Sequence, residues 1–308
     1  MPRAAGGGML LKAVLRFHGS RISSFLNLTV PARVSGRGIR VPLVAGVGFD
    51  NLQPTERWMD TVLPVLLGHR GGTFVDVGVN VGQTLIKLRR FDAAVPYVGF
   101  EPNPVCYTYT QKLIAENRFE HCTLVPVGLS NTATVVSFHM RSDSDVGAST
   151  VDGFRKFGEG PHDVRLVPVF TGDDMLERLG TPSVSVLKVD VEGAELEVLQ
   201  GFEATLARRP FVLCEILPLF SHDGPKGRFR KPRQDALLAF MRHAGYALYR
   251  ILPDASALPL RDIDVHRDPE LTNYLFAPQE SCALVDSALR VRAAEDPIAN
   301  RSSLIPNP

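Results

Sequence analysis

The side chains best suited to chemistry in this sequence follow its most apolar runs. Asp76 closes one such run, and Gly78, Asn80 and Gly82 follow at two-residue steps. Glycine adopts backbone conformations that a Cβ would obstruct, and asparagine tolerates the left-handed region. We therefore expect a buried strand that turns tightly into a helix over residues 83–90, the geometry on which nucleotide-like cofactors rest. Such a turn is a weak signal alone, because many strand-to-helix turns bind nothing.

Asp76 narrows the class of cofactor. Turns that bind dinucleotides present backbone N–H groups and a helix N-terminus to a pyrophosphate, which a carboxylate at this position would repel. A cofactor that places an ammonium group there, and no phosphate, would be attracted instead. S-adenosylmethionine has this chemistry, because it combines an amino-acid end with a sulfonium, a ribose and an adenine.

A second carboxylate closes the next apolar run. Glu101 lies about 20 positions after the glycine turn, the spacing at which an acid reaches the ribose hydroxyls of such a cofactor. Prolines on both sides of Asn103 restrict the backbone, so we expect Asn103 near the adenine. The end of a third strand, over residues 123–127, would bring Leu129 or its backbone alongside the same ring.

A third apolar run, over residues 184–190, carries charges at alternate positions. Lys188, Asp190 and Glu192 would share one face of a strand that continued to residue 192. Charges are costly on a strand buried on both faces, which indicates a functional role. The alternative is structural, because Lys188 could simply pair with one of the two acids. A further apolar run contains Glu215.

The ordered combination of these segments resembles the FkbM-type methyltransferases. That family has the patterns Asp-x-Gly-x-Asn-x-Gly, Glu-Pro-Asn-Pro and Lys-x-Asp-x-Glu-Gly-x-Glu, the last running into Val-Leu-x-Gly. Here they stand at residues 76–82, 101–104, 188–195 and 198–201. The likeness extends from about residue 56 to residue 278. It implies methyl transfer from S-adenosylmethionine, usually to a hydroxyl of a sugar, polyketide or other small molecule. Val79 and Gly172 depart from the usual pattern, but no cofactor position is lost.

Methyl transfer from a sulfonium requires the protein to align the nucleophile and remove its proton. The catalytic candidates are Asp190 and Glu192, as base or hydroxyl orienter, together with Lys188. Burial would raise the pKa of these acids and Lys188 would lower it. With Glu215 they could also gather a divalent ion, but no ligand spacing is diagnostic, so no metal is predicted. The His-Asp pair at 222–223 is a lesser base candidate.

Strand and helix patterns alternate along most of the chain, which favours a parallel, doubly wound sheet. With the resemblance, this predicts an α/β, Rossmann-like, mainly parallel seven-stranded sheet of the class I methyltransferase type, with an antiparallel last strand. The expected strands lie near residues 73–77, 96–100, 123–127, 184–190, 210–216, 246–252 and 272–276. We expect an N-terminal extension of a helix and short β elements over 1–54, the methyltransferase domain over 55–280 and a disordered tail over 281–308.

Composition excludes few functions. The net charge of +1 offers no electrostatic case for nucleic acid, so the expected partner is a small-molecule hydroxyl acceptor. The four cysteines show no metal or disulfide spacing, which indicates a reduced, cytoplasmic protein. No apolar stretch approaches the roughly 20 residues of a membrane span. The Ser-, Asp- and Gly-rich segment 141–160 is either a binding loop or merely mobile.

Two other classes of function stay open. The first is an NAD-type oxidoreductase, which Asp76 and the missing third glycine of G-x-G-x-x-G disfavour. The second is a cofactor-binding protein without catalysis, which the alternating charges disfavour less strongly.

Overall fold

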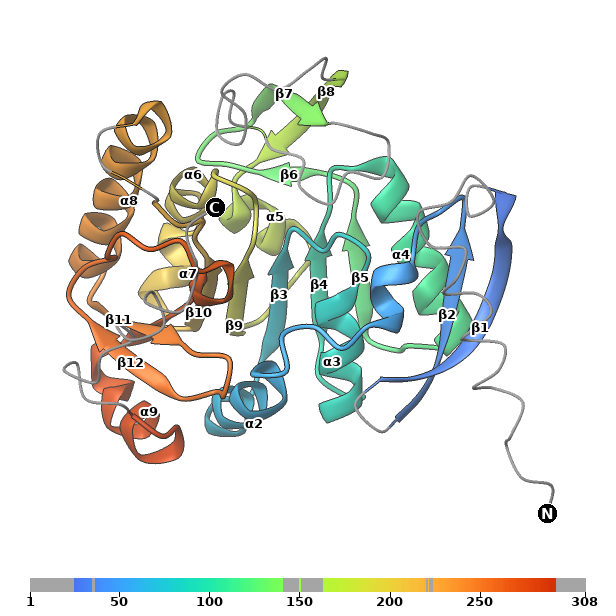
Figure 1. The fold of residues 1–308 in the computed structure, drawn as a ribbon, viewed down its shortest axis with the longest axis horizontal. Coiled ribbons are helices and arrows are strands. Elements are labelled where there is room, and N and C mark those ends of the chain that lie inside the picture. Colours follow the sequence, from blue (N-terminus) through green and yellow to red (C-terminus); the bar gives the residue numbers. More distant parts are fainter. Residues whose placement is uncertain are drawn as a thin grey trace, which may run out of the picture.

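A twisted sheet of eight strands forms the centre of the molecule (Figure 1), in a computed structural model that describes residues 25–34, 37–140, 150, 163–219, 221 and 224–291. The strand order is β12-β11-β13-β10-β9-β3-β4-β5. Their bounds are β3 Thr73–Val77, β4 Tyr97–Phe100, β5 Cys122–Val125, β9 Val184–Val189, β10 Phe211–Glu215, β11 Tyr246–Ile251, β12 Ala257–Leu260 and β13 Asn273–Pro278.

Five adjacent strands of this sheet, in the order β5-β4-β3-β9-β10, pair in parallel. Strand β13 runs antiparallel to both of its neighbours, β10 and β11. The expected Rossmann-like sheet with an antiparallel last strand is therefore confirmed. The expected number of seven strands is wrong by one, because β12 pairs with β11 at the edge. A short turn reverses the chain here, held by Asp254, whose carboxylate accepts hydrogen bonds from Ser256. Pro259 within β12 hides the strand in the sequence, since proline is confined to edge strands.

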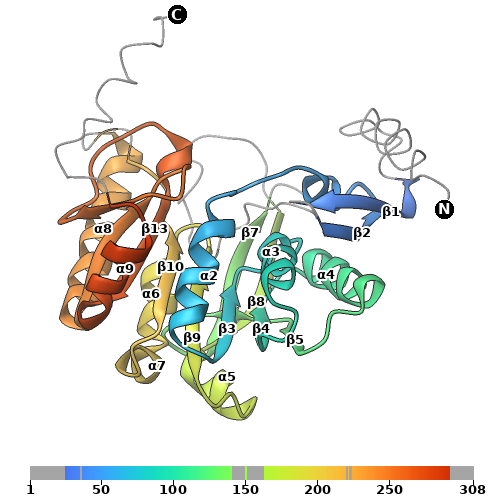
Figure 2. The same cartoon turned by 90° about the horizontal axis from the view of Figure 1, so that it is seen from below.

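Helices cover both faces of the sheet (Figures 1 and 2). Phe74 belongs to the core cluster that includes residues of α2 and α3, whereas its neighbour Val75 belongs to the one that includes residues of α6, α7 and α8. The alternation along β3 thus buries both faces, as in other parallel sheets. The helices are α2 Met59–His69, α3 Gln83–Phe91, α4 Pro104–Asn117, α5 Gly172–Arg178, α6 Glu195–Gln200, α7 Glu203–Ala207, α8 Pro225–His243 and α9 Cys282–Ala288.

The N-terminal extension contributes an antiparallel hairpin of β1 (Asn27–Val34) and β2 (Arg37–Val44). Its apolar face, which includes Val30 and Val41, packs against Tyr109 and Leu113 of α4. The short β elements expected in this region are therefore present. The helix expected nearer the N-terminus lies outside the described residues.

A smaller sheet combines β6 (Gly128–Leu129), β7 (Thr134–Met140) and β8 (Asp163–Phe170), in the order β6-β8-β7. The segment 141–160, for which we considered a binding loop, lies outside the described residues except for Thr150. None of the helices in the described ranges has the length and apolar character needed to cross a bilayer.

The C-terminal segment is ordered further than expected. Helix α9 follows β13 directly, and its Val285 is fully buried among residues of the core on the α2 side of the sheet. Leu289 is buried there too, and Val291 bridges to Ala257. The prediction of disorder from residue 281 is therefore wrong for residues 282–291, because apolar side chains at helical spacing anchor them.

Candidate active site

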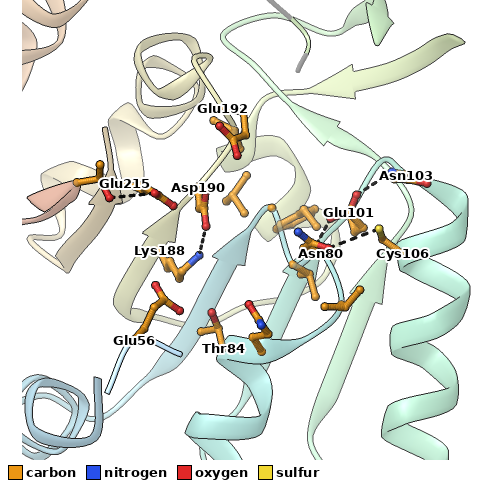
Figure 3. A pocket seen from close by; sticks show the side chains of 18 of the residues that line it. Glu56, Asn80, Thr84, Glu101, Asn103, Cys106, Lys188, Asp190, Glu192 and Glu215 are labelled. Carbon is orange, nitrogen blue, oxygen red and sulfur yellow. Dashed lines mark hydrogen bonds and ion pairs between the residues drawn. The ribbon is translucent and has the colours of Figure 1, made fainter. Parts of the chain in front are cut away.

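A cavity of about 610 Å³ opens at the carboxyl ends of β3, β4, β9 and β10. This edge is where parallel α/β sheets bind their ligands, and the volume suits a small molecule. The walls include the loops after these strands, the segment 50–58 before α2 and the beginning of β13. Side chains from all of them converge on the cavity (Figure 3).

The turn between β3 and α3 has the backbone that its sequence predicts. Gly78, Asn80 and Gly82 all adopt positive φ values, of 88°, 53° and 76°. A Cβ on Gly78 would lie 1.9 Å from the carbonyl oxygen of Asp190, so only glycine lets this turn approach the end of β9. Gly78 and Asn80 line the cavity, whereas Gly82 does not.

Glu101 joins the turn after β3 to the one after β4. Its Oε2 accepts a hydrogen bond of 2.6 Å from the Asn80 N–H, and its Oε1 accepts one of 2.8 Å from the Asn103 N–H. Burial raises the pKa of Glu101 to about 7, although these two hydrogen bonds lower it. A nearly buried carboxylate therefore stands at the end of β4 and lines the cavity.

The two residues expected beside an adenine line the same cavity. Asn103 is the N-cap of α4, and its side-chain oxygen accepts a hydrogen bond of 3.0 Å from the Val105 N–H. This contact fixes the orientation of the amide. Leu129, in β6, is buried and supplies apolar surface to the cavity wall.

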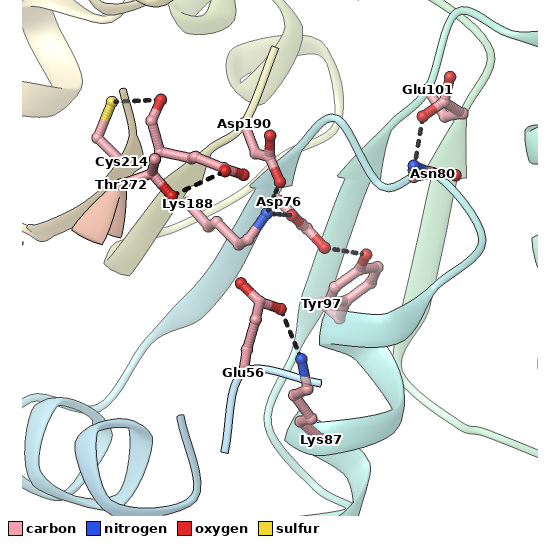
Figure 4. Close-up of polar contacts among 11 residues, drawn as sticks. Glu56, Asp76, Asn80, Lys87, Tyr97, Glu101, Lys188, Asp190, Cys214 and Thr272 are labelled. Atoms are coloured by element: carbon pink, nitrogen blue, oxygen red, sulfur yellow. Dashed lines mark hydrogen bonds and ion pairs between the residues drawn. The ribbon is translucent and has the colours of Figure 1, made fainter. Parts of the chain in front are cut away.

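Asp76 is fully buried and does not line the cavity. Figure 4 shows it between Tyr97 and Lys188. The Tyr97 hydroxyl donates a 2.8 Å hydrogen bond to its Oδ2, and the Lys188 Nζ lies 3.8 Å from its Oδ1. Burial raises the pKa of Asp76 to about 6, with Lys188 and Tyr97 opposing the shift. The expected contact of Asp76 with the cofactor stays a prediction, but its carboxylate does not line the cavity. The reason is strand alternation, which turns Asp76 to the same face as Phe74, under α2 and α3.

Lys188 connects Asp76 to the cavity. Its Nζ lies 3.0 Å from Asp190 Oδ2, which is the structural pairing that the sequence left open. Burial lowers the pKa of Lys188, but the charges of Asp190, Asp76 and Glu56 outweigh that effect and raise the pKa above its ordinary value. Lys188 is thus held as a cation.

Asp190 and Glu192 also line the cavity. They do not continue the strand as expected, because β9 ends at Val189 and Glu192 has a left-handed φ of 55°. A turn, and not strand alternation, places Glu192 at the cavity. The three predicted catalytic side chains nevertheless come together there (Figure 3).

Further polar residues complete the cavity wall. Glu215, at the end of β10, accepts a 3.0 Å hydrogen bond from the Thr272 hydroxyl. Burial raises the pKa of Glu215 to about 9, and the negative charges of Asp190 and Glu192 add to the shift. Glu56, before α2, forms an ion pair of 2.6 Å with the buried Lys87. The position of Glu215 at the carboxyl end of a parallel strand could have predicted its place in the site. No feature of the sequence predicts that Glu56 lines the cavity.

The described residues include no group of three or more His, Cys, Asp or Glu arranged to hold a metal ion. The absence of a metal site stays a prediction. The lesser base candidates His222 and Asp223 lie outside the described residues.

Comparison with known proteins gives a consistent set of relatives. Residues 76–248 match the family model described as the methyltransferase FkbM domain. The chain is 33% identical over 143 residues to the hexuronic acid methyltransferase AglP of Haloferax volcanii, covering 46% of this chain and 54% of that protein. It is 29% identical over 154 residues to the methyltransferase sdnD of Sordaria araneosa, covering 42% and 60%. The chain thus spans little more than half the length of these curated relatives.

Solved structures of methyltransferases align with this chain only at low similarity. A methyltransferase FkbM from Methylobacillus flagellatus aligns at 15% identity and a TM-score of 0.41, over 67% of this chain and 43% of that one. A putative O-methyltransferase from Klebsiella pneumoniae aligns at 9% identity and a TM-score of 0.42, over 89% and 95%.

Proposed function

This chain belongs to the FkbM methyltransferase family, and from that premise we propose that it methylates a hydroxyl group of a small molecule. Family membership also makes S-adenosylmethionine the cofactor, since it is the methyl donor of these enzymes. The observation that carries the proposal is that residues of all three family motifs line one cavity, among them Asn80, Glu101 and Asp190.

The residues present fit S-adenosylmethionine. This cofactor supplies a methyl group already activated on a sulfonium. Glu101 is our candidate for the ribose hydroxyls, because a buried carboxylate that accepts two N–H bonds keeps further lone pairs. Asn103 and Leu129 would contact the adenine. The turn of Gly78, Asn80 and Gly82 would shape the site for the amino-acid end.

Negative charge for the cofactor's ammonium is available from Glu56, which lines the cavity. Asp76 would act indirectly, because its carboxylate contacts Lys188, which lines the cavity, and does not line the cavity itself. We therefore assign Asp76 a positioning role, in which it helps to hold Lys188 charged and in place.

For the chemical step, the chain must orient the acceptor hydroxyl and take its proton. Asp190 is our first candidate, with Glu192 as the second, since both carboxylates line the cavity at the end of β9. The ammonium of Lys188 fixes one oxygen of Asp190, which leaves the other oxygen for the acceptor. Lys188 thereby positions the base.

The class of acceptor rests on the relatives. One of them is named for hexuronic acid, which supports a hydroxylated small molecule such as a sugar as the acceptor. The absence of a nucleic-acid partner remains a prediction, as does the cytoplasmic location suggested by four cysteines that form no disulfide. A cofactor-binding protein without turnover is the remaining alternative.

Calorimetric titration separates these functions. We expect S-adenosylmethionine and S-adenosylhomocysteine to bind with dissociation constants in the micromolar range, which corresponds to a binding free energy of about −8 kcal/mol. We expect no binding of NAD. A screen of hydroxylated sugars and polyketides for labelled methyl incorporation then identifies the acceptor. Binding of NAD in place of S-adenosylmethionine would contradict the proposal, and cofactor binding without turnover on any acceptor would favour the non-catalytic alternative.

A further inference from the structure

Glu215 and Asp190 are neighbours at the floor of the cavity. In the parallel pairing of β10 with β9, Cys214 is opposite Val189, so the next residues of the two strands lie side by side. Both side chains line the cavity and lie close together in Figure 3. The hydroxyl of Thr272, the residue just before β13, donates a 3.0 Å hydrogen bond to one oxygen of Glu215. The carboxyl group of Glu215 keeps a second oxygen for other contacts.

If both acids of this pair were ionised, negative charges would outnumber positive charges around them. On the β9 side, Glu215 faces Lys188, Asp190 and Glu192, and on the β13 side it meets the uncharged Thr272. Lys188 is already shared between Asp76 and Asp190. Among the described residues that line the cavity, the only other cation is Arg57.

Two carboxyl groups in such contact do not both ionise easily and share a proton instead. Burial and the neighbouring acids raise the pKa of Glu215 to about 9, which places the shared proton on Glu215. A hydrogen bond between the two side chains contributes to that shift. At neutral pH the pair therefore carries a single negative charge.

We propose that Asp190 and Glu215 hold one proton in common before the cofactor binds, and that the positive charge of S-adenosylmethionine expels it. The inference rests on the proposed function, because it assigns Glu215 a role in the same site. The proton passes from Glu215 to solvent, and the pair is left with two negative charges against the cofactor's one positive charge. Asp190 then no longer accepts a hydrogen bond from Glu215, so its carboxylate can accept the hydroxyl proton of the acceptor. A base thus becomes available only when the methyl donor is in place.

S-adenosylhomocysteine is the matched control ligand, because it lacks the methyl group and the positive charge but keeps the rest of the cofactor. Calorimetry at pH 8, in two buffers of different ionisation enthalpy, counts the protons released by each ligand. For the wild type we expect S-adenosylmethionine to release roughly one proton more than S-adenosylhomocysteine. Equivalently, its affinity should increase about tenfold from pH 7 to pH 8 relative to that of S-adenosylhomocysteine.

Two variants test whether Glu215 is the source of the proton. Glu215→Gln keeps the shape of the side chain and an acceptor for Thr272 but cannot release a proton, so the difference between the ligands should vanish. Glu195→Gln removes another buried carboxyl, whose pKa is raised to about 7 by burial and which does not line the cavity. It should behave as the wild type. Binding of S-adenosylhomocysteine to both variants shows that their sites are folded.

The outcomes separate this inference from the proposed function. Equal proton release by the two ligands in the wild type, or an unchanged difference in Glu215→Gln, overturns the inference while cofactor binding stands. Loss of the difference in both variants also overturns it, because the proton would not be specific to Glu215. Failure of both ligands to bind the wild type would instead overturn the proposed function.

Discussion

Lys188 decides the electrostatics of the site. It is buried between Asp76 on β3 and Asp190 at the end of β9, and its charge is what makes two nearby carboxylates tolerable there. Removing one member of such a buried group leaves the others uncompensated, which typically costs several kcal/mol. The three residues therefore form one unit, in which Asp190 alone faces the cavity beside Lys188.

The sequence predicted most of these residues but not their arrangement. Alternating charges in an apolar run pointed to Lys188, Asp190 and Glu192, and all three line the cavity. The direction of Asp76 was not predictable, because the sequence does not tell which face of β3 the helices α2 and α3 cover. Glu56 escaped notice for a related reason, since only the tertiary fold brings it to Lys87.

Asp190→Asn tests the proposed base. Loss of proton abstraction should lower kcat by about 10²- to 10⁴-fold, while the affinity for S-adenosylmethionine changes much less. Turnover and cofactor binding are measured separately, with Glu192→Gln in parallel. Asp174→Asn, on the exposed face of α5, is the control that should leave both quantities unchanged. Full turnover in Asp190→Asn and Glu192→Gln alike would remove both residues as bases.

At the level of elements, the site depends on a close approach between the turn after β3 and the end of β9. Gly78 provides it, and the amide of residue 190 donates a backbone hydrogen bond of 3.0 Å to Val77. The spacing of glycines predicted the turn, because positions with positive φ favour glycine. The contact between Gly78 and Asp190 was not predictable from the sequence, because it joins segments more than a hundred residues apart.

Elements interrupted by proline were harder to predict. Helix α8 begins at Pro225 and contains Pro232, although proline inside a helix usually kinks or ends it. The basic residues between positions 226 and 233 are therefore part of this helix. Arg233 pairs with Glu197 of α6, and the buried Arg230 donates to the carbonyl of Pro218.

Gly78→Ala tests the close approach. A methyl group would meet the Asp190 carbonyl in a backbone conformation with φ of 88°, so we expect a loss of about 3 kcal/mol in the free energy of unfolding. Gly180→Ala is the matched control, because φ is 63° and no atom lies within 4 Å. It should cost only about 1 kcal/mol. Denaturant titration measures both, and equal losses would show that backbone strain alone, and not the contact with β9, requires Gly78.

At the scale of the whole molecule, β13 inserts between β10 and β11 and carries α9 back onto the sheet. This insertion brings Thr272 to Glu215, so the end of the domain takes part in the site. We propose that the catalytic unit, expected over residues 55–280, extends through α9 to residue 291. Polar residues in this segment concealed the packing, although Leu284, Val285, Leu289 and Val291 are apolar and pack on the core.

Val285→Ala tests the extended boundary. Val285 is fully buried, so its truncation should lower the free energy of unfolding by about 1–3 kcal/mol. Ser287→Ala, two residues along on the exposed side of α9, should change it by less than about 0.5 kcal/mol. A loss no larger in Val285→Ala than in Ser287→Ala would mean that α9 is not packed on the domain.

The most direct measurement of the central claim is the crystal structure of this chain with S-adenosylhomocysteine. The account predicts the ligand in the cavity at the carboxyl ends of β3 and β4, with its ribose hydroxyls on Glu101 and its sulfur facing Asp190 and Glu215. The ligand bound elsewhere, or a cavity that stays empty at saturating ligand, would contradict it.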